Sequence, residues 1–278
     1  MEEIRICAFF DVLGTREIMM GEDEGRRHEL IKLVQKLSAN SSSYSPNVQN
    51  LGLGVVMSPS AQSTSFSDNV AVSFPIKRLN IPGKIGNEDH TFFVEASSFF
   101  DHLLAQIVIA VWDGLKMGLL FRGGISMGRL VHNDQIIAGE ALVKAVELEK
   151  ETKFPRVEIE EEIINLKDDN GNFVIKDYVR DECLEKIDDR WFVKSLIFHN
   201  GYWRDHNWYR QQEGKGPEEI PVVLKRIKER LDQEKVKIDQ SSVAPVKEKW
   251  DWFMDKFKRT ILDENWNLIK GAKEIMND

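Results

Sequence analysis

The sequence predicts an α+β fold: a mixed, mainly antiparallel sheet flanked by helices, with a helical appendage at the C-terminus. Short strand-like runs alternate with longer helical patterns as far as residue 160. Several of these runs follow one another closely enough to form hairpins, which give antiparallel pairs. The last stretch, residues 216–278, is charged and helical in pattern. We therefore expect one domain over residues 1–210 and a helical extension over residues 211–278.

The first elements follow from hydrophobic periodicity. Residues 4–10 are apolar and predict a strand. Residues 24–38 predict a helix, and the polar residues 39–50 that follow predict a loop. The apolar stripe of that helix consists of Leu30, Ile31, Leu33, Val34 and Leu37.

The next part of the chain predicts a hairpin and a connector. Residues 51–58 and 63–74 have strand patterns, and Pro59 and Ser60 between them suit a turn. Residues 75–91 contain two prolines and two glycines, so we expect an exposed connector there.

The longest helical pattern covers residues 92–117, and Gly118 is suited to cap its C-terminal end. Residues 119–131 predict a strand, a glycine-rich turn and a second strand. Gly139 is expected to open a helix that runs to residue 151.

Three further elements are expected towards the C-terminus. A strand is predicted over residues 155–159, and a small hairpin at the sheet edge over residues 188–193. The helical extension carries an aromatic packing face of Trp250, Trp252, Phe253 and Phe257.

The bulk composition is that of a soluble globular chain. It has 278 residues, 42% of them hydrophobic and 30% charged, and a formal net charge of -8. This acidic balance argues against broad binding to nucleic acid or to an acidic membrane surface, because both need a basic face. Two cysteines are too few for a disulfide framework. No cleavable signal peptide or membrane-spanning stretch is visible, so the expected compartment is the cytoplasm.

Two aspartates stand out beside apolar strand patterns. Asp11 follows the first strand and precedes a glycine turn, and Asp68 lies within the 63–74 strand pattern. A carboxylate beside apolar strands is costly unless it has a partner. If the two strands are neighbours, a divalent cation is the partner that both carboxylates suggest.

Four segments, in this order, resemble the catalytic domain of class III nucleotidyl cyclases. They are residues 9–15, 66–74, 121–128 and 139–149, which look like two metal motifs, a strand with its turn, and the helix that follows. The resemblance covers roughly residues 4–160. It implies a cyclase-like, ferredoxin-related fold, two Mg²⁺ or Mn²⁺ ions per site on Asp11 and Asp68, and a homodimer with its sites at the interface.

Several positions depart from the purine-specific members of that family. Val143 and Glu147 stand where the family has an asparagine and an arginine that serve the ribose and the transition-state phosphate. Gln62 stands at the purine-reading lysine, and Ile136 lies near the purine-reading aspartate. Both metal aspartates remain while the purine-reading residues are absent.

This combination is similar to the pyrimidine cyclases of the bacterial Pycsar antiphage system. The runs Arg122-Gly123-Gly124-Ile125, Pro155-Arg156-Val157 and Trp250-Asp251-Trp252 resemble that branch. The resemblance implies an enzyme that converts UTP, or alternatively CTP, to a 3′,5′-cyclic nucleotide and pyrophosphate. It also implies that a separate effector protein reads the product.

The chemistry assigns further roles around the two aspartates. The Val12 carbonyl is a candidate third metal ligand, and the amides of the Leu13-Gly14-Thr15 turn are candidates to cradle phosphates. Arg122 is the favoured replacement for the missing arginine, with Arg129 as the alternative. Gln62 offers a donor and an acceptor to a pyrimidine edge.

Other interpretations stay open. Asp11 also suits a turn or a helix cap, and Arg122 suits a surface salt bridge. Gly123 and Gly124 suit an unusual backbone conformation as well as a ligand contact. At the level of function, a cyclase-like module that binds nucleotide without turnover, or a purine cyclase with unusual determinants, remain alternatives.

Overall fold

The computed structural model describes residues 2–42, 62–66, 69–76, 79–85, 88–94, 96–167, 171–196, 216, 219–241, 244–262 and 275–276. The strands are β1 (Glu3–Leu13), β2 (Gln62–Phe66), β3 (Asn69–Pro75), β4 (Leu79–Ile85), β5 (Glu88–Val94), β6 (Leu120–His132), β7 (Ile137–Gly139), β8 (Val157–Ile159), β9 (Leu184–Ile187) and β10 (Arg190–Val193). The helices are α1 (Thr15–Met20), α2 (Glu24–Ser42), α3 (Ala96–Lys116), α4 (Glu140–Glu151), α5 (Glu161–Ile164), α6 (Asp177–Cys183), α8 (Ile220–Ser241) and α9 (Ala244–Leu262).

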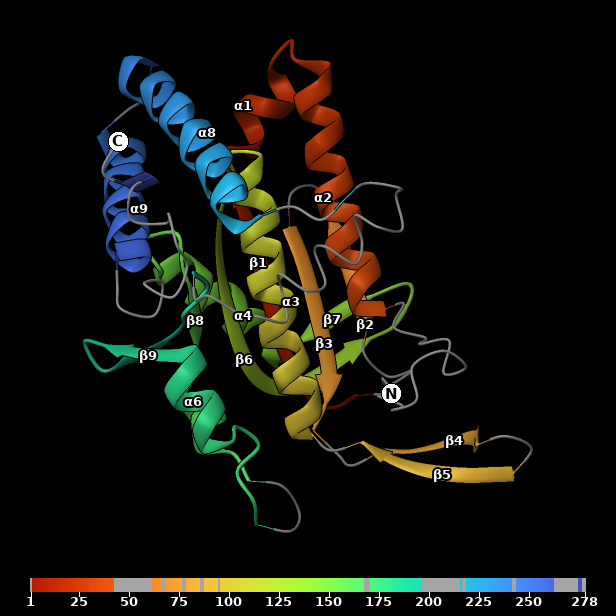
Figure 1. Ribbon diagram of the computed structural model, residues 1–278. Helices are drawn as coiled ribbons and strands as arrows, with labels where there is room; N and C mark the ends of the chain where they lie inside the picture. The colour runs from red at the N-terminus through yellow and green to blue at the C-terminus, as the bar shows by residue number, and fades with distance from the viewer. Residues whose placement is uncertain are drawn as a thin grey trace.

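Eight strands form one mixed sheet in the order β2-β3-β1-β6-β8-β10-β9, with β7 paired to β6. All pairs in it are antiparallel except β6 with β8. Strands β4 and β5 form a separate two-stranded sheet. The predicted α+β class, with a mainly antiparallel sheet, flanking helices and C-terminal helices, is confirmed (Figure 1).

The two faces of β1 are covered by different helices. Successive side chains of a strand point to opposite faces. Ile6, Ala8 and Phe10 belong to the main core together with residues of α2 and α3. Cys7 packs with Ala141 on the other face, where α4 lies against β1 and β6. Figure 1 shows α3 in front of the sheet, with α4 on its far side.

Strand β6 is continuous, so the predicted glycine-rich turn within residues 119–131 is wrong. The two glycines there allow close approach instead. A Cβ on Gly124 would lie 2.2 Å from the Ala145 carbonyl oxygen of α4, and one on Gly123 would lie 2.7 Å from the Phe9 carbonyl oxygen. The hairpin turn comes later, between β6 and β7, and Gly139 then begins α4 with a φ of 145°.

Two other expected segments are wrong. The segment 63–74 is two strands, β2 and β3, paired with each other; residues 51–58 lie outside the described part of the chain. The segment 75–91 is a connector only in part, because β4 and most of β5 lie in it. Proline and glycine are tolerated there since a two-stranded sheet has only edge strands.

Helix α2 continues to Ser42, beyond the expected end at residue 38. Its contacts with β2, β3 and α3 outweigh the low helix propensity of serine and asparagine. Helix α3 begins only at Ala96, because residues 92–94 belong to β5, and Gly118 follows it with the predicted positive φ of 73°.

The C-terminal helices share the core of the sheet. The predicted aromatic face of α9 is confirmed, with Trp252 partly buried and Trp250, Phe253 and Phe257 buried. From α8, buried residues of the same core are Val223, Leu224, Ile227 and Leu231. The domain boundary at residue 210 stays a prediction. In the described part of the chain, no helix is both long and apolar enough to cross a membrane.

Candidate functional site

Asp11 lies inside β1 rather than after its end, because the strand runs on to Leu13. Its Cα partners are Asn69 of β3 on one side and Arg122 of β6 on the other. Asp11 is an odd-numbered residue of β1, so it shares the α4 face of the sheet with Cys7 and Phe9. The position puts a carboxylate at the end of a buried face, with its side chain 20% exposed.

Arg122 joins Asp11 to a carboxylate that the sequence analysis did not single out. The Arg122 Nη2 atom donates to Asp11 Oδ2 at 3.2 Å, and the same atom forms an ion pair with Glu149 Oε1 of α4. The Arg122 side chain is 18% exposed and that of Glu149 only 5%. Two residues proposed for the site from sequence, Asp11 and Arg122, are therefore in direct contact.

Glu149 reaches Arg122 because of its place on α4. Ala141, Ala145 and Glu149 follow at intervals of four and form the buried face of this helix. Burial raises the pKa of the Glu149 carboxyl; Arg122 opposes this shift and the negative charge of Asp11 adds to it. The sequence did contain a signal for Glu149, because a glutamate follows two alanines at the spacing of one helix face.

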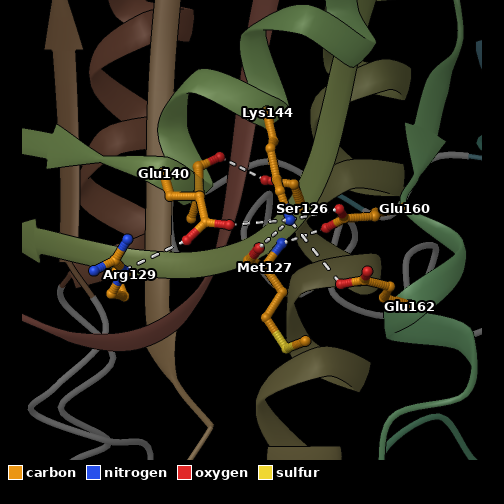
Figure 2. Close-up of polar contacts among 8 residues, drawn as sticks. Ser126, Met127, Arg129, Glu140, Lys144, Glu160 and Glu162 are labelled. Carbon is orange, nitrogen blue, oxygen red and sulfur yellow. Dashed lines mark hydrogen bonds and ion pairs between the residues drawn. The ribbon is translucent and has the colours of Figure 1, made fainter.

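A second polar cluster holds α4 in place (Figure 2). Lys144 forms ion pairs with Glu140 at 3.4 Å and with Glu160 at 2.9 Å, and it donates to the Met127 carbonyl of β6 at 3.3 Å. Glu160 in turn accepts from the Met127 amide at 2.8 Å. These contacts tie the first half of α4 to β6, and so they help to orient Glu149 further along the helix.

The Val12 carbonyl points towards the edge of β1 that pairs with β3, just beyond the point where that pairing stops. The Ile76 amide donates to the Ile4 carbonyl, so even-numbered residues of β1 direct their backbone groups towards β3. The pairing with β3 stops at Asn69 opposite Asp11, so no residue of β3 pairs with Val12. Asp68 precedes Asn69 in sequence but lies outside the described residues.

The predicted glycine turn after β1 is present. Gly14 has a φ of 85°, and Thr15 begins the six-residue helix α1. A Cβ on Gly14 would meet nothing within 4 Å, so the backbone there is open. The Leu13-Gly14-Thr15 turn follows Asp11 on the same strand end, and its phosphate-cradling role stays a prediction.

Gln62 lies on the same face of the sheet as Asp11 but further along it. Its partner on β3 is Ser73, and Ser73 is paired with Cys7 of β1. Four positions of β1, roughly 13 Å at about 3.3 Å per residue, and one intervening strand separate Gln62 from Asp11. The Oε1 atom of Gln62 is buried and meets no hydrogen-bond donor among the described residues. One chain thus does not bring Gln62 to Asp11.

A buried polar chain lies next to Gln62. Arg5 Nε donates to Ser73 Oγ at 2.8 Å, and Ser73 Oγ lies 2.8 Å from His132 Nδ1. His132 Nε2 lies 2.9 Å from Thr64 Oγ1. Because Ser73 accepts from Arg5, its own hydrogen is available to Nδ1, which leaves the His132 proton on Nε2 facing Thr64. Burial, and then the charge of Arg5, lower the pKa of His132 to about 4.

The residues that replace the purine determinants are exposed. Val143 is 56% exposed and Ile136 is 51% exposed, and Glu147 also faces outward from α4. Arg129, the alternative to Arg122, lies near Glu140 with 66% of its side chain exposed. Asp11, Arg122 and Glu149 form what we call the Asp11 cluster. None of the four exposed side chains belongs to it within one chain.

The described residues contain no group of three or more histidine, cysteine, aspartate or glutamate side chains arranged to hold a metal ion. Asp11 and the Val12 carbonyl are hard oxygen donors that suit Mg²⁺ or Mn²⁺. These two residues are candidate ligands. Asp68, which lies outside the described residues, would be a third. The chain matches no protein-family model and no curated protein sequence.

Proposed function

We propose that the protein is a metal-dependent nucleotidyl cyclase that converts a pyrimidine nucleoside triphosphate, UTP in preference to CTP, to a 3′,5′-cyclic nucleotide and pyrophosphate. In this proposal it works as a homodimer in bacterial antiphage defence, and a separate effector protein reads the product.

One observation carries the proposal. Asp11 is paired directly with Asn69, the chain neighbour of Asp68, and with Arg122. An acidic oxygen donor, a backbone carbonyl from Val12 and a basic side chain thus converge where β1 leads into an open glycine turn. That combination suits a triphosphate with its divalent cations.

The reaction is an in-line displacement at phosphorus. The ribose 3′-oxygen attacks the α-phosphorus, the new P–O bond closes the ring, and the bond to the β-phosphate oxygen breaks to release pyrophosphate. The 3′-hydroxyl proton passes to solvent. Divalent ions on Asp11 and Asp68 would supply charge neutralisation at the attacking and leaving oxygens. The Leu13-Gly14-Thr15 amides would hold the terminal phosphates.

Arg122 changes partner in this scheme. Arg122 would give up the Asp11 carboxylate to a bound divalent cation, while its ion pair with Glu149 would keep the guanidinium near the site. Arg122 is then available for bidentate contact with phosphate oxygens, which suits its planar donor geometry.

Selection of the base is assigned to Gln62. Its buried Oε1 lacks a donor among the described residues, and a pyrimidine edge offers one. The separation of Gln62 from Asp11 within one chain favours a site shared by two copies, in which Gln62 of one copy faces Asp11 of the other.

A catalytically silent nucleotide-binding module is the second candidate. The observation that favours it is the contact of Arg122 with Asp11, which neutralises the carboxylate without a metal ion. The exposed Val143 and Glu147, in place of the ribose and transition-state residues, point the same way.

The test incubates the full-length protein with ATP, GTP, CTP and UTP separately, each with Mn²⁺, and identifies products by mass spectrometry. We expect cyclic UMP as the main product, with cyclic CMP the alternative. Cyclic AMP or cyclic GMP as the main product would assign a purine cyclase. Nucleotide binding without any cyclic product would assign the silent module.

A further inference from the structure

Helix α9 is docked onto strand β9 and the segment between α4 and β8 by polar and aromatic side chains. Trp252 stacks on Phe154 with ring centroids 4.8 Å apart and planes 13° apart. Lys256 forms an ion pair with Glu185 of β9 at 2.8 Å, and Glu248 forms one with Lys153. These three contacts follow one another at intervals of four along α9 and fix the rotation of the helix about its axis.

This rotation turns one lysine towards the sheet. Lys249, Phe253 and Phe257 follow at intervals of four, so they share one stripe of α9. Phe253 and Phe257 are 4% and 2% exposed and belong to the main core. Lys249 is half-buried and forms no hydrogen bond or ion pair with any described residue. A lysine in such a stripe is costly without an anionic partner.

Lys249 lies within electrostatic range of Asp11, Arg122 and Glu149. The charges of Arg122, Asp11 and Glu149 all act on its ammonium group. Burial, followed by the positive charge of Arg122, lowers the pKa of Lys249, while Asp11 and Glu149 oppose that shift. The charges of Lys249 and Glu149 thus act on each other from stripes of α9 and α4 that carry buried residues.

The charges of these four groups balance, with two carboxylates against a guanidinium and an ammonium. With a divalent cation bound at Asp11, these partly buried groups would carry a surplus of positive charge. An anion with several negative charges is the ligand that removes this surplus. Lysine is suited to that role because its ammonium is a compact charge with three donors on a flexible stem.

We propose that Lys249 binds the polyphosphate of the substrate, so that α9 is part of the active site. This rests on the proposed function, and it assigns the helical extension a role in substrate binding.

The test measures binding of inorganic tripolyphosphate by calorimetry, with and without Mg²⁺, to the full-length protein. We expect Lys249→Met to weaken binding in Mg²⁺ by at least about 10-fold, a typical effect of one lost charge-assisted contact. Lys249→Arg should keep the affinity within about threefold. The matched control is Lys258→Met, since Lys258 is exposed on the same helix; it should bind as the wild type does.

Unchanged affinity in Lys249→Met, or no binding of tripolyphosphate to the wild type, would overturn the assignment. Thermal unfolding of each variant, and the behaviour of Lys249→Arg, separate a binding defect from a folding defect. Loss of affinity in Lys249→Met without cyclic product from the wild type would leave the anion site standing and reject the cyclase. Cyclic product from the wild type, with an unaltered KM in Lys249→Met, would support the cyclase and reject the role of Lys249.

Discussion

Arg5 is 3% exposed, and its charge is accommodated by specific partners rather than by solvent. It donates to Ser73 Oγ and to the Ser73 carbonyl, and it forms an ion pair with Glu3. The neutral form of His132 continues this chain to Thr64. The same logic governs Arg122 between Asp11 and Glu149. Arg5 and Arg122 are therefore both paired with carboxylates.

His132 should make stability depend on pH. Its pKa is lowered from 6.5 to about 4 on folding, so the unfolded state binds the proton first as pH falls. The free energy of unfolding contributed by neutral His132 is fully present above pH 6.5 and is lost as pH falls towards 4. The pKa difference between the unfolded and the folded state corresponds to about 3 kcal/mol in the free energy of unfolding. Urea unfolding between pH 4.5 and 7.5 should show this slope in the wild type and a flatter one in His132→Gln.

The control for this prediction is His28→Gln, since His28 is exposed on α2 and should leave the slope unchanged. Identical pH profiles for the wild type and His132→Gln would contradict the lowered pKa.

At the scale of elements, the contact between β6 and α4 sets the geometry of the site. The glycines of β6 allow α4 to lie against the strand, and the Lys144 cluster holds the first half of the helix. Glu149 then meets Arg122 from the last turns of α4. A change in the distance between β6 and α4 would therefore move Glu149 as well as cost stability.

Gly124→Ala tests this contact. The new methyl group would lie 2.2 Å from the Ala145 carbonyl oxygen and 2.7 Å from Leu148 Cβ, and backbone cannot yield as a flexible side chain does. We expect a loss of roughly 1–3 kcal/mol in the free energy of unfolding. Gly25→Ala, where the nearest atom is 3.4 Å away, should be neutral or stabilising by up to about 1 kcal/mol. Equal stability of both variants in denaturant titration would refute the close approach.

The sequence predicted most elements where the pattern is local. The apolar run of residues 4–10 identified β1, and the apolar stripe identified α3. Gly123 and Gly124 suggested a turn in the sequence. In the structure Gly124 makes room for α4 and Gly123 for the neighbouring strand β1, and no local pattern reveals such contacts. Pro82 and Gly83 similarly concealed β4. Asp11 and Arg122 were singled out separately, but their contact depends on the register of two strands that are far apart in sequence.

For the candidate site, residue type was more informative than position. Glu149 and Lys249 each interrupt a buried stripe, which is a detectable signal, yet their convergence depends on how α4 and α9 dock. Asp68 was predicted within one strand covering residues 63–74. Its neighbour Asn69 instead begins β3, opposite Asp11.

At the scale of the whole molecule, the C-terminal helices and the sheet share one hydrophobic core. Helix α8 contacts α3 and α9, and Figure 1 shows α8 and α9 on the same side of the molecule. Phe257 of α9 lies against Trp112 of α3, with ring centroids 6.4 Å apart and an angle of 60° between the rings. This arrangement implies that α9 and the sheet unfold together.

Phe257→Ala should therefore destabilise the entire protein. Phe257 is 2% exposed, and loss of such a side chain from a core costs about 3–5 kcal/mol. We expect one cooperative unfolding transition at a lower denaturant concentration than in the wild type, with the same midpoint when it is monitored by tryptophan fluorescence and by circular dichroism. Lys258→Ala, an exposed neighbour, should stay within about 0.5 kcal/mol of the wild type. A loss below about 1 kcal/mol, or separate transitions for the two probes, would show that α9 is only loosely attached.

The central claim is that Asp11 and Asp68 jointly hold divalent cations beneath a triphosphate. The most direct measurement is Mn²⁺ binding by electron paramagnetic resonance in the presence of 3′-deoxy-UTP, which lacks the attacking hydroxyl. We predict nucleotide-dependent Mn²⁺ binding in the wild type and its loss in Asp11→Asn and in Asp68→Asn, with little further loss in the double variant because both carboxylates serve one site. Undiminished Mn²⁺ binding in either single variant, or none in the wild type, would contradict the account.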